Sequence, residues 1–121
     1  MSTVLDLAVA YLEVFFSGDV EGAADFLADD FEFDGPLSHY GSAEEFAAGS
    51  APFVAGLRPG WRQVAAFGDQ DEALLLYDLL LLDGTKLRVA NHLVFVGKKI
   101  VKETIVFDTN SLPTSRAKTR P

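Results

Sequence analysis

The chain has 121 residues, no cysteine, a net charge of −8 and 49% hydrophobic residues. This length fits one domain with its own core, and the lack of cysteine excludes a disulfide framework and a thiolate metal site. Residues 1–57 hold 11 acidic side chains and no basic one, whereas residues 58–121 hold all 10 Lys and Arg. Because an acidic half repels phosphate backbones, nucleic acid is not expected as a partner.

The sequence gives no sign of a secretory or membrane-spanning segment. The first 16 residues contain Asp6 and Glu13 but no basic residue, so they are not expected to act as a signal peptide. The most apolar run, LLLYDLLLL, is far shorter than the ~20 residues that a spanning helix needs, and Asp78 interrupts it. We expect a soluble, cytoplasmic protein with no membrane partner.

The first third of the chain is predicted to be mainly helical. Apolar residues at helical spacing predict a helix over residues 3–17, which Gly18 ends. Asp19 can cap a second helix that runs to about Ala28. A short strand over residues 31–34 follows, with Phe and acidic residues alternating between its two faces.

Further helical structure is predicted after the loop GPLSHYG. Ser42 and Glu45 form a capping box that opens a helix over residues 43–49. Pro52 fits the first turn of another helical piece, which ends near Leu57.

The rest of the chain predicts an antiparallel meander of four strands, over residues 62–67, 73–82, 86–96 and 100–107. Asp83-Gly84 is typical of a tight hairpin turn between the middle two strands. Helices followed by strands indicate an α+β domain, which we expect over residues 1–109. Residues 110–121, with little to bury, are expected to form a flexible tail.

The long strands are apolar on both faces, and the helices can cover only one of them. The other face is therefore expected to be buried by a second copy of the chain. We assign to this homodimer interface a face that carries a row of alternating residues: Leu75, Tyr77, Leu79, Leu81 and His92.

Two stretches carry a family resemblance: YLEVFFSGDVEGAADFLADDFEFDGP, from Tyr11 to Pro36, and GKKIVKETIVFD, from Gly97 to Asp108. They resemble the nuclear-transport-factor-2-like superfamily, which includes ketosteroid isomerase, the SnoaL-like polyketide cyclases and limonene epoxide hydrolase. The resemblance implies a cone-shaped fold with N-terminal helices packed on a curved, mostly antiparallel β-sheet. It also implies a pocket for an apolar small molecule, and none of the motifs is specific for one reaction.

The resemblance to ketosteroid isomerase implies two hydrogen-bond donors in that pocket. Tyr11 stands at the tyrosine that donates to the oxyanion in that enzyme, and Asn91, four residues before Phe95, stands at the second donor. The alternative for Tyr11 is a core tyrosine satisfied by a backbone carbonyl. A buried amide must be hydrogen-bonded or it destabilises the fold. The isomerase's basic aspartate precedes a proline, but Gly35 occupies that place here and Asp34 lies one residue early, on the other face unless a bulge intervenes.

Asp78 is the favoured candidate for the catalytic base. It interrupts an apolar row, so it must be paired or protonated, and it matches the first aspartate of the epoxide hydrolase pattern. In that pattern Leu76 replaces the arginine and Ile105 the last aspartate. The alternative is that Asp78 is a structural charge bonded to Arg62 or Arg88.

Five more residues are predicted to bind the substrate: Phe33, His39, Trp61, Glu103 and Phe107. Glu103 shares the pocket face if Phe107 does, and its alternative is a partner of Lys102 or Lys86 at the rim of the sheet. His39 flanks the loop at the expected mouth of the pocket, and its alternative is a solvated loop residue. The two histidines have no metal-binding spacing, so we expect no metal.

Two functions remain open. The chain is predicted to be a small enzyme, an isomerase, cyclase or hydratase that needs no cofactor and transfers protons on an apolar cyclic or polyketide-like substrate. In this hypothesis Tyr11 and Asn91 polarise an oxygen, while Asp78 or Asp34 moves the proton. The alternative is a binding or accessory protein with the same pocket and no chemistry, which the missing base favours.

Overall fold

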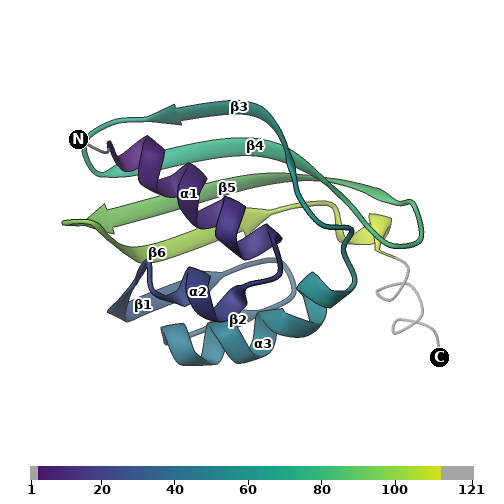
Figure 1. Ribbon diagram of the computed structural model, residues 1–121, viewed down its shortest axis with the longest axis horizontal. Coiled ribbons are helices and arrows are strands. Elements are labelled where there is room, and N and C mark those ends of the chain that lie inside the picture. Colours follow the sequence, from purple (N-terminus) through teal and green to yellow (C-terminus); the bar gives the residue numbers. More distant parts are fainter. Residues whose placement is uncertain (1–2, 113–121) are drawn as a thin grey trace.

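The computed structural model describes residues 3–112, which form three α-helices and a six-stranded sheet (Figure 1). The elements in chain order are α1 (Val4–Phe16), α2 (Val20–Ala24), β1 (Leu27–Asp34), β2 (His39–Tyr40), α3 (Ala43–Ala55), β3 (Arg62–Gly68), β4 (Glu72–Leu80), β5 (Lys86–Val96), β6 (Lys99–Val106) and the short 3₁₀ helix η1 (Thr109–Ser111).

The strands lie in the order β2-β1-β6-β5-β4-β3, so the last strand is in the middle of the sheet. Only β1 and β6 pair in parallel, and every other neighbouring pair is antiparallel. Figure 1 shows a curved, open sheet with α1 lying across one face, and with α2 and α3 beside β1 and β2. The predicted α+β class is confirmed.

The first helix matches its prediction, but the second is shorter. Thr3 caps α1 by accepting from the backbone N–H of Asp6, and Asp6 caps Thr3 in return. α2 ends at Ala24 and does not run to Ala28, because the chain then joins the sheet. Ile100 donates to the carbonyl of Phe26 at 2.9 Å at the start of this pairing.

α3 is one continuous helix, so its predicted division at Pro52 is wrong. Ser42 accepts from the N–H of Glu45 at 3.1 Å, as the capping pattern predicts. Proline removes the hydrogen bond to the carbonyl of Ala48. Ala48 is exposed, so water can satisfy that carbonyl and the helix continues to Ala55.

The hairpin between β4 and β5 has a different register from the tight turn that Asp83-Gly84 predicts. A two-residue turn would pair Leu76 with Asn91. The loop instead spans three residues, because Leu81 donates to the carbonyl of Thr85 at 2.8 Å, and Asn91 lies opposite Leu75. A shift of one residue moves every side chain of a strand to the other face.

This register corrects the predicted interface. Leu75, Tyr77 and Leu79 are almost fully buried in the core of a single chain, on the face that the helices cover. His92 lies on the opposite, convex face, where its ring is 2.7 Å from Glu72. The apolar residues that the convex face exposes are a different set, which includes Phe67, Leu74, Leu80 and Val106.

Two sequence predictions concern the ends of the chain and its relation to membranes. Among residues 3–112 no helix is long and apolar enough to cross a membrane. Leu112 is buried at the end of η1, so the described structure continues past residue 109. The other predicted tail residues, 113–121, lie outside the described part, and their flexibility stays a prediction.

Candidate functional site

Three polar side chains form a diagonal row across the concave face of the sheet. Asn91 in β5 pairs with Leu75 in β4 and with Ile105 in β6. Tyr77 and Glu103 are each two residues from these partners, in opposite directions along the sheet, so the row is diagonal. Alternation places all of them on the same face. Each is at most 3% exposed.

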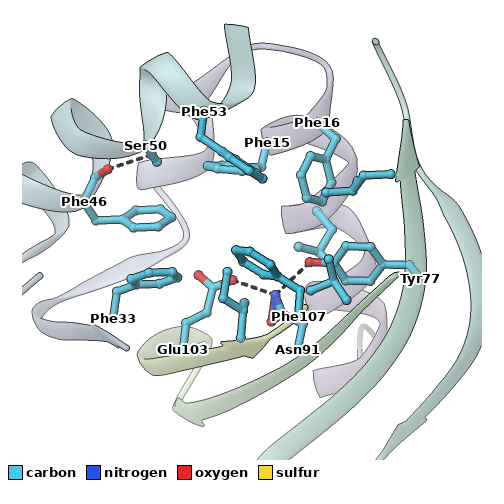
Figure 2. Close-up of a pocket in the computed structure, with 14 residues that line it drawn as sticks. Phe15, Phe16, Phe33, Phe46, Ser50, Phe53, Tyr77, Asn91, Glu103 and Phe107 are labelled. Carbon is cyan, nitrogen blue, oxygen red and sulfur yellow. Dashed lines mark hydrogen bonds between the residues drawn. The ribbon is translucent and has the colours of Figure 1, made fainter. Parts of the chain in front are cut away.

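Glu103 is the centre of this row, and both of its carboxyl oxygens accept hydrogen bonds. The hydroxyl of Tyr11, which α1 presses against the sheet, donates to Oε1 at 2.6 Å. Nδ2 of Asn91 donates to Oε2 at 2.8 Å and contacts the hydroxyl oxygen of Tyr77 at 3.1 Å. The four residues therefore form one buried chain of hydrogen bonds, part of which Figure 2 shows.

Burial determines the protonation of these groups. Loss of hydration raises the pKa of Glu103 from its ordinary 4.5 to about 7, although the hydrogen bond from Tyr11 lowers it. Burial raises the pKa of the Tyr11 and Tyr77 hydroxyls, and the nearby charge of Glu103 raises both further. Near neutral pH Glu103 can hence hold or release a proton, while both tyrosines keep theirs.

Asn91 is only partly satisfied in this arrangement. Its Nδ2 has two acceptors, but its buried Oδ1 has no hydrogen-bond partner among the described residues. A buried acceptor without a donor costs roughly 1–3 kcal/mol. The amide therefore lies in a place where a ligand hydroxyl could stabilise it.

The row borders a small cavity between the sheet and the helices. The cavity has a volume of about 50 Å³, and Figure 2 shows its aromatic lining above the polar row. Its lining is mostly apolar and comes from α1, β1, α3, β4, β5 and the end of β6: Leu12, Phe15, Phe16, Phe33, Phe46, Ser50, Phe53, Tyr77, Leu79, Val89, Asn91, Glu103, Ile105 and Phe107.

Asp78 does not lie with these residues, so the predicted convergence of Asp78 with Tyr11 and Asn91 is wrong. It projects from the convex face, where Arg88 donates to both of its oxygens at 2.8 and 3.0 Å. Arg62 and Lys86 each approach it to 3.9 Å. The hydrogen bonds from Arg88 lower the pKa of Asp78, which makes it a structural anion rather than a base near the cavity.

The other predicted site residues divide into two groups. Phe33 and Phe107 line the cavity together with Glu103 and Asn91. The remaining four do not line it: Tyr11, which contacts Glu103, together with Asp34, His39 and Trp61. Asp34 and His39 are exposed and face each other across β1 and β2, and Trp61 packs behind Tyr77 with ring centroids 5.3 Å apart.

Sequence reasoning missed Tyr77 as a site residue because the hairpin register placed it on the wrong face. The aromatic wall from α3, Phe46 and Phe53, was missed as well, since helical spacing alone does not show what a helix covers. Within residues 3–112 no group of three or more His, Asp or Glu side chains could hold a metal ion.

Comparisons with known proteins agree with this architecture. The family model described as SnoaL-like domain matches residues 8–103. A protein from Kribbella flavida DSM 17836 has a TM-score of 0.85 and 29% identity, with coverage of 94% of this chain and 93% of the other. A comparison with curated proteins finds no match.

Two more distant structures share the fold alone. An NTF2-like protein of unknown function from Cytophaga hutchinsonii ATCC 33406 has a TM-score of 0.76 at 18% identity and covers 91% of this chain and 94% of its own. A steroid delta-isomerase from Pseudomonas aeruginosa has a TM-score of 0.75 at 12% identity and covers 98% of this chain and 91% of its own.

Proposed function

The chain belongs to the SnoaL-like domain family, and from this premise we propose that it catalyses cofactor-independent proton transfer on an apolar cyclic ketone or enol. The observation that best supports this proposal is the state of the Glu103 carboxyl, which is 3% exposed and has a pKa raised to about 7 by burial. A general acid or base works best when its pKa lies near the operating pH. The reaction class is isomerisation, cyclisation or hydration.

In this proposal Glu103 replaces Asp78 and Asp34 as the group that moves the proton. An ionised carboxylate has about four acceptor positions, and Tyr11 and Asn91 occupy two of them. The remaining positions can take a proton from a carbon next to a carbonyl. The carboxylic acid that forms then returns the proton to another carbon of the same substrate, so no net change in protonation is needed.

The charge that develops on the substrate oxygen needs a donor close to Glu103. Tyr77 lines the cavity, and its hydroxyl accepts from Asn91, so its own proton remains available for donation. A buried donor stabilises a developing oxyanion more strongly than water does. We assign this role to Tyr77, with Asn91 as the residue that orients it, and Tyr11 as the donor that holds Glu103.

The alternative function is binding without chemistry. The same cavity would hold an apolar ligand, and the raised pKa of Glu103 would only reflect burial. The unpartnered Oδ1 of Asn91 suits this alternative, because a bound hydroxyl would satisfy it.

Hydrogen–deuterium exchange separates the two functions without knowledge of the natural substrate. β-Tetralone is an apolar cyclic ketone whose exchange in D₂O can be followed by proton NMR. The wild-type protein should accelerate the exchange, and Glu103→Gln should reduce this acceleration by about 10²-fold or more. Glu32→Gln, which alters an exposed carboxylate on β1, is the matched control and should leave the rate unchanged.

Three outcomes would decide against Glu103 as the base. Equal rates for wild type and Glu103→Gln would exclude it. A loss of rate in Asp34→Asn would assign the role to the exposed carboxylate at the end of β1. Binding of β-tetralone without exchange would support the binding function.

We also propose that the convex face forms a homodimer, in the cytoplasm. Exposed apolar residues lie on this face of β3 and β4, among them Phe67, Leu74 and Leu80. One end of β4 carries Asp69, Asp71 and Glu72, and the other carries a basic group: Arg62, Lys86 and Arg88. Two copies packed face to face with antiparallel β4 strands would place opposite charges together.

A further inference from the structure

A second cavity lies directly outside the first, at the open end between the loop after β1 and the C-terminal half of α3. Its volume is about 140 Å³. The residues that line only this outer cavity come from the loop, from β2 and from α3: Gly35, Pro36, Leu37, Ser38, Tyr40 and Gly49. No charged side chain lines it, in contrast to the inner cavity with Glu103.

The two cavities share five lining residues, which therefore form the wall between them: Phe33, Ser50, Phe53, Ile105 and Phe107. A cavity of about 150 Å³ holds a benzene ring, whereas a water molecule needs only about 10–15 Å³. The outer cavity is thus the size of one ring, and the inner one holds a few atoms. A ring cannot reach Glu103 unless the wall opens.

Two of the three aromatic members of this wall are less buried than the third. Phe33 is 7% exposed and packs between Phe46 and Tyr40, with ring centroids 4.9 and 5.7 Å away. Phe53 and Phe107 are only half-buried, and their rings stack on each other at 6.4 Å and 18°. Figure 2 shows these two rings on the helix side and the sheet side of the inner cavity.

We propose that Phe53 and Phe107 form an aromatic gate between the cavities, and that the ligand is an uncharged, planar molecule with one ring in the outer cavity and one oxygen in the inner cavity. This inference rests on the proposed function for the direction of the oxygen. The inner cavity, with the polar row, takes the oxygen and the carbon atoms next to it, while the uncharged outer lining takes the rest of the ring. A charged or bulky ligand would not fit either part.

The gate predicts that entry of a ring is limited by rotation of Phe53 or Phe107. An open arrangement of this kind is commonly a minor population of about 0.1–10%, so removal of one ring should raise the association rate about tenfold or more. β-Naphthol is a suitable probe, because it is planar, carries one oxygen and changes in fluorescence on burial. Stopped-flow mixing gives its association rate constant.

The variants are Phe53→Ala and Phe107→Ala, with Leu82→Ala as the control that removes an exposed apolar side chain outside both cavities. Either gate variant should bind β-naphthol faster than wild type, and the control should match wild type. Circular dichroism checks folding, and Phe53→Leu, which keeps most of the apolar volume, serves if the alanine variant unfolds. Unchanged rates in all folded gate variants would overturn the gate.

The ligand class is tested with methylnaphthalene, which has nearly the same shape and no oxygen. It should bind wild type about tenfold more weakly than β-naphthol, which corresponds to one lost hydrogen bond. Equal affinity of the two compounds, or tighter binding of naphthoate, would contradict the inferred class. The protein turns over neither compound. A lack of β-tetralone proton exchange would therefore contradict only the proposed function, whereas unchanged association rates in the gate variants would contradict only the gate.

Discussion

Tyr11 in α1 donates its hydroxyl proton to Glu103 in β6 over 2.6 Å, although the two residues are 92 positions apart in the sequence. This bond favours the ionised form of Glu103, whereas burial favours the neutral form. The protonation of the site near pH 7 is the balance of these two effects, and it can be shifted by single substitutions.

Loss of the Tyr11 hydroxyl should make Glu103 a weaker acid. A hydrogen bond to a charged group contributes about 1.5–3 kcal/mol, so Tyr11→Phe should raise the pKa of Glu103 by roughly one unit or more. Carbon-13 NMR of the Glu103 carboxyl measures the titration directly. Phe15→Leu changes a neighbouring ring without touching this bond and is the control. A titration that stays near pH 7 in Tyr11→Phe would show that burial alone sets the pKa.

Glu103 should make the protein more stable at acidic than at alkaline pH. Its pKa is about 7 when folded and is expected to be near 4.5 when unfolded, so between these values the folded state holds a proton that the unfolded state releases. The stabilisation is complete below about pH 4.5 and is lost as the pH rises through about 7, a change of roughly 3 kcal/mol.

Glu103→Gln cannot titrate, which isolates this effect from the other carboxylates. Denaturant unfolding should show the free energy of the wild type falling relative to the variant by roughly 3 kcal/mol between about pH 4 and about pH 8. Parallel curves for the two proteins would mean that Glu103 has the same pKa in the folded and unfolded states.

Asp78 should matter for stability and not for chemistry. Arg88 satisfies both of its oxygens on the convex face, away from the cavity. Asp78→Asn removes the negative charge that faces the three cations Arg62, Lys86 and Arg88, so the melting temperature should fall. Proton exchange of β-tetralone should continue at the wild-type rate. A strong loss of exchange in a folded Asp78→Asn protein would restore Asp78 as a catalytic residue.

A charge on the convex face should separate the proposed dimer. Leu74 is 49% exposed in the single chain, and Leu74→Glu would bury a carboxylate without a partner in the interface. Sedimentation at micromolar concentration should give the mass of two chains for the wild type and of one for the variant. The control variant Leu37→Glu changes a 56% exposed residue in the loop between β1 and β2, and it should remain a dimer.

Gly49 is expected to be required for the outer cavity, although alanine is the better helix former. A Cβ at this position would lie 2.3 Å from the Tyr40 hydroxyl, so the ring would have to move. The clash should cost about 1–3 kcal/mol and outweigh the ~1 kcal/mol gain in helix propensity. Gly56→Ala meets no atom closer than 3.5 Å and is the control. Greater stability of Gly49→Ala would show that Tyr40 rotates away freely.

The sequence predicts the parts of the site that depend on alternation within one strand. Asn91 and Glu103 lie on the concave face as their apolar neighbours indicate, and Tyr11 lies on the buried side of its helix. What the sequence does not reveal is how these residues meet. Their hydrogen bonds join three strands and a helix, and no local pattern fixes such contacts.

The location of Asp78 depends on the length of one loop. Asp83-Gly84 favours a two-residue turn, but Gly84 adopts a φ of +94° in a three-residue loop. One extra residue exchanges the faces of β4, so Asp78 points outward and Tyr77 inward. A prediction of catalytic residues from strand alternation is therefore only as sound as the prediction of the turn that sets the strand register.

The parallel pairing of β1 with β6 also affects how the protein can be made in the cell. During synthesis the ribosome releases residues 27–34 long before residues 99–106, so β1 has no neighbour on that side until β6 has also emerged. The three-stranded meander β3-β4-β5 can form earlier, but Tyr11, Asn91 and Tyr77 cannot complete their hydrogen-bond network until Glu103 has been released. Contacts between distant segments slow folding. Because an unpaired strand edge favours aggregation, we expect the nascent chain to depend most on protection by chaperones before β6 leaves the exit tunnel.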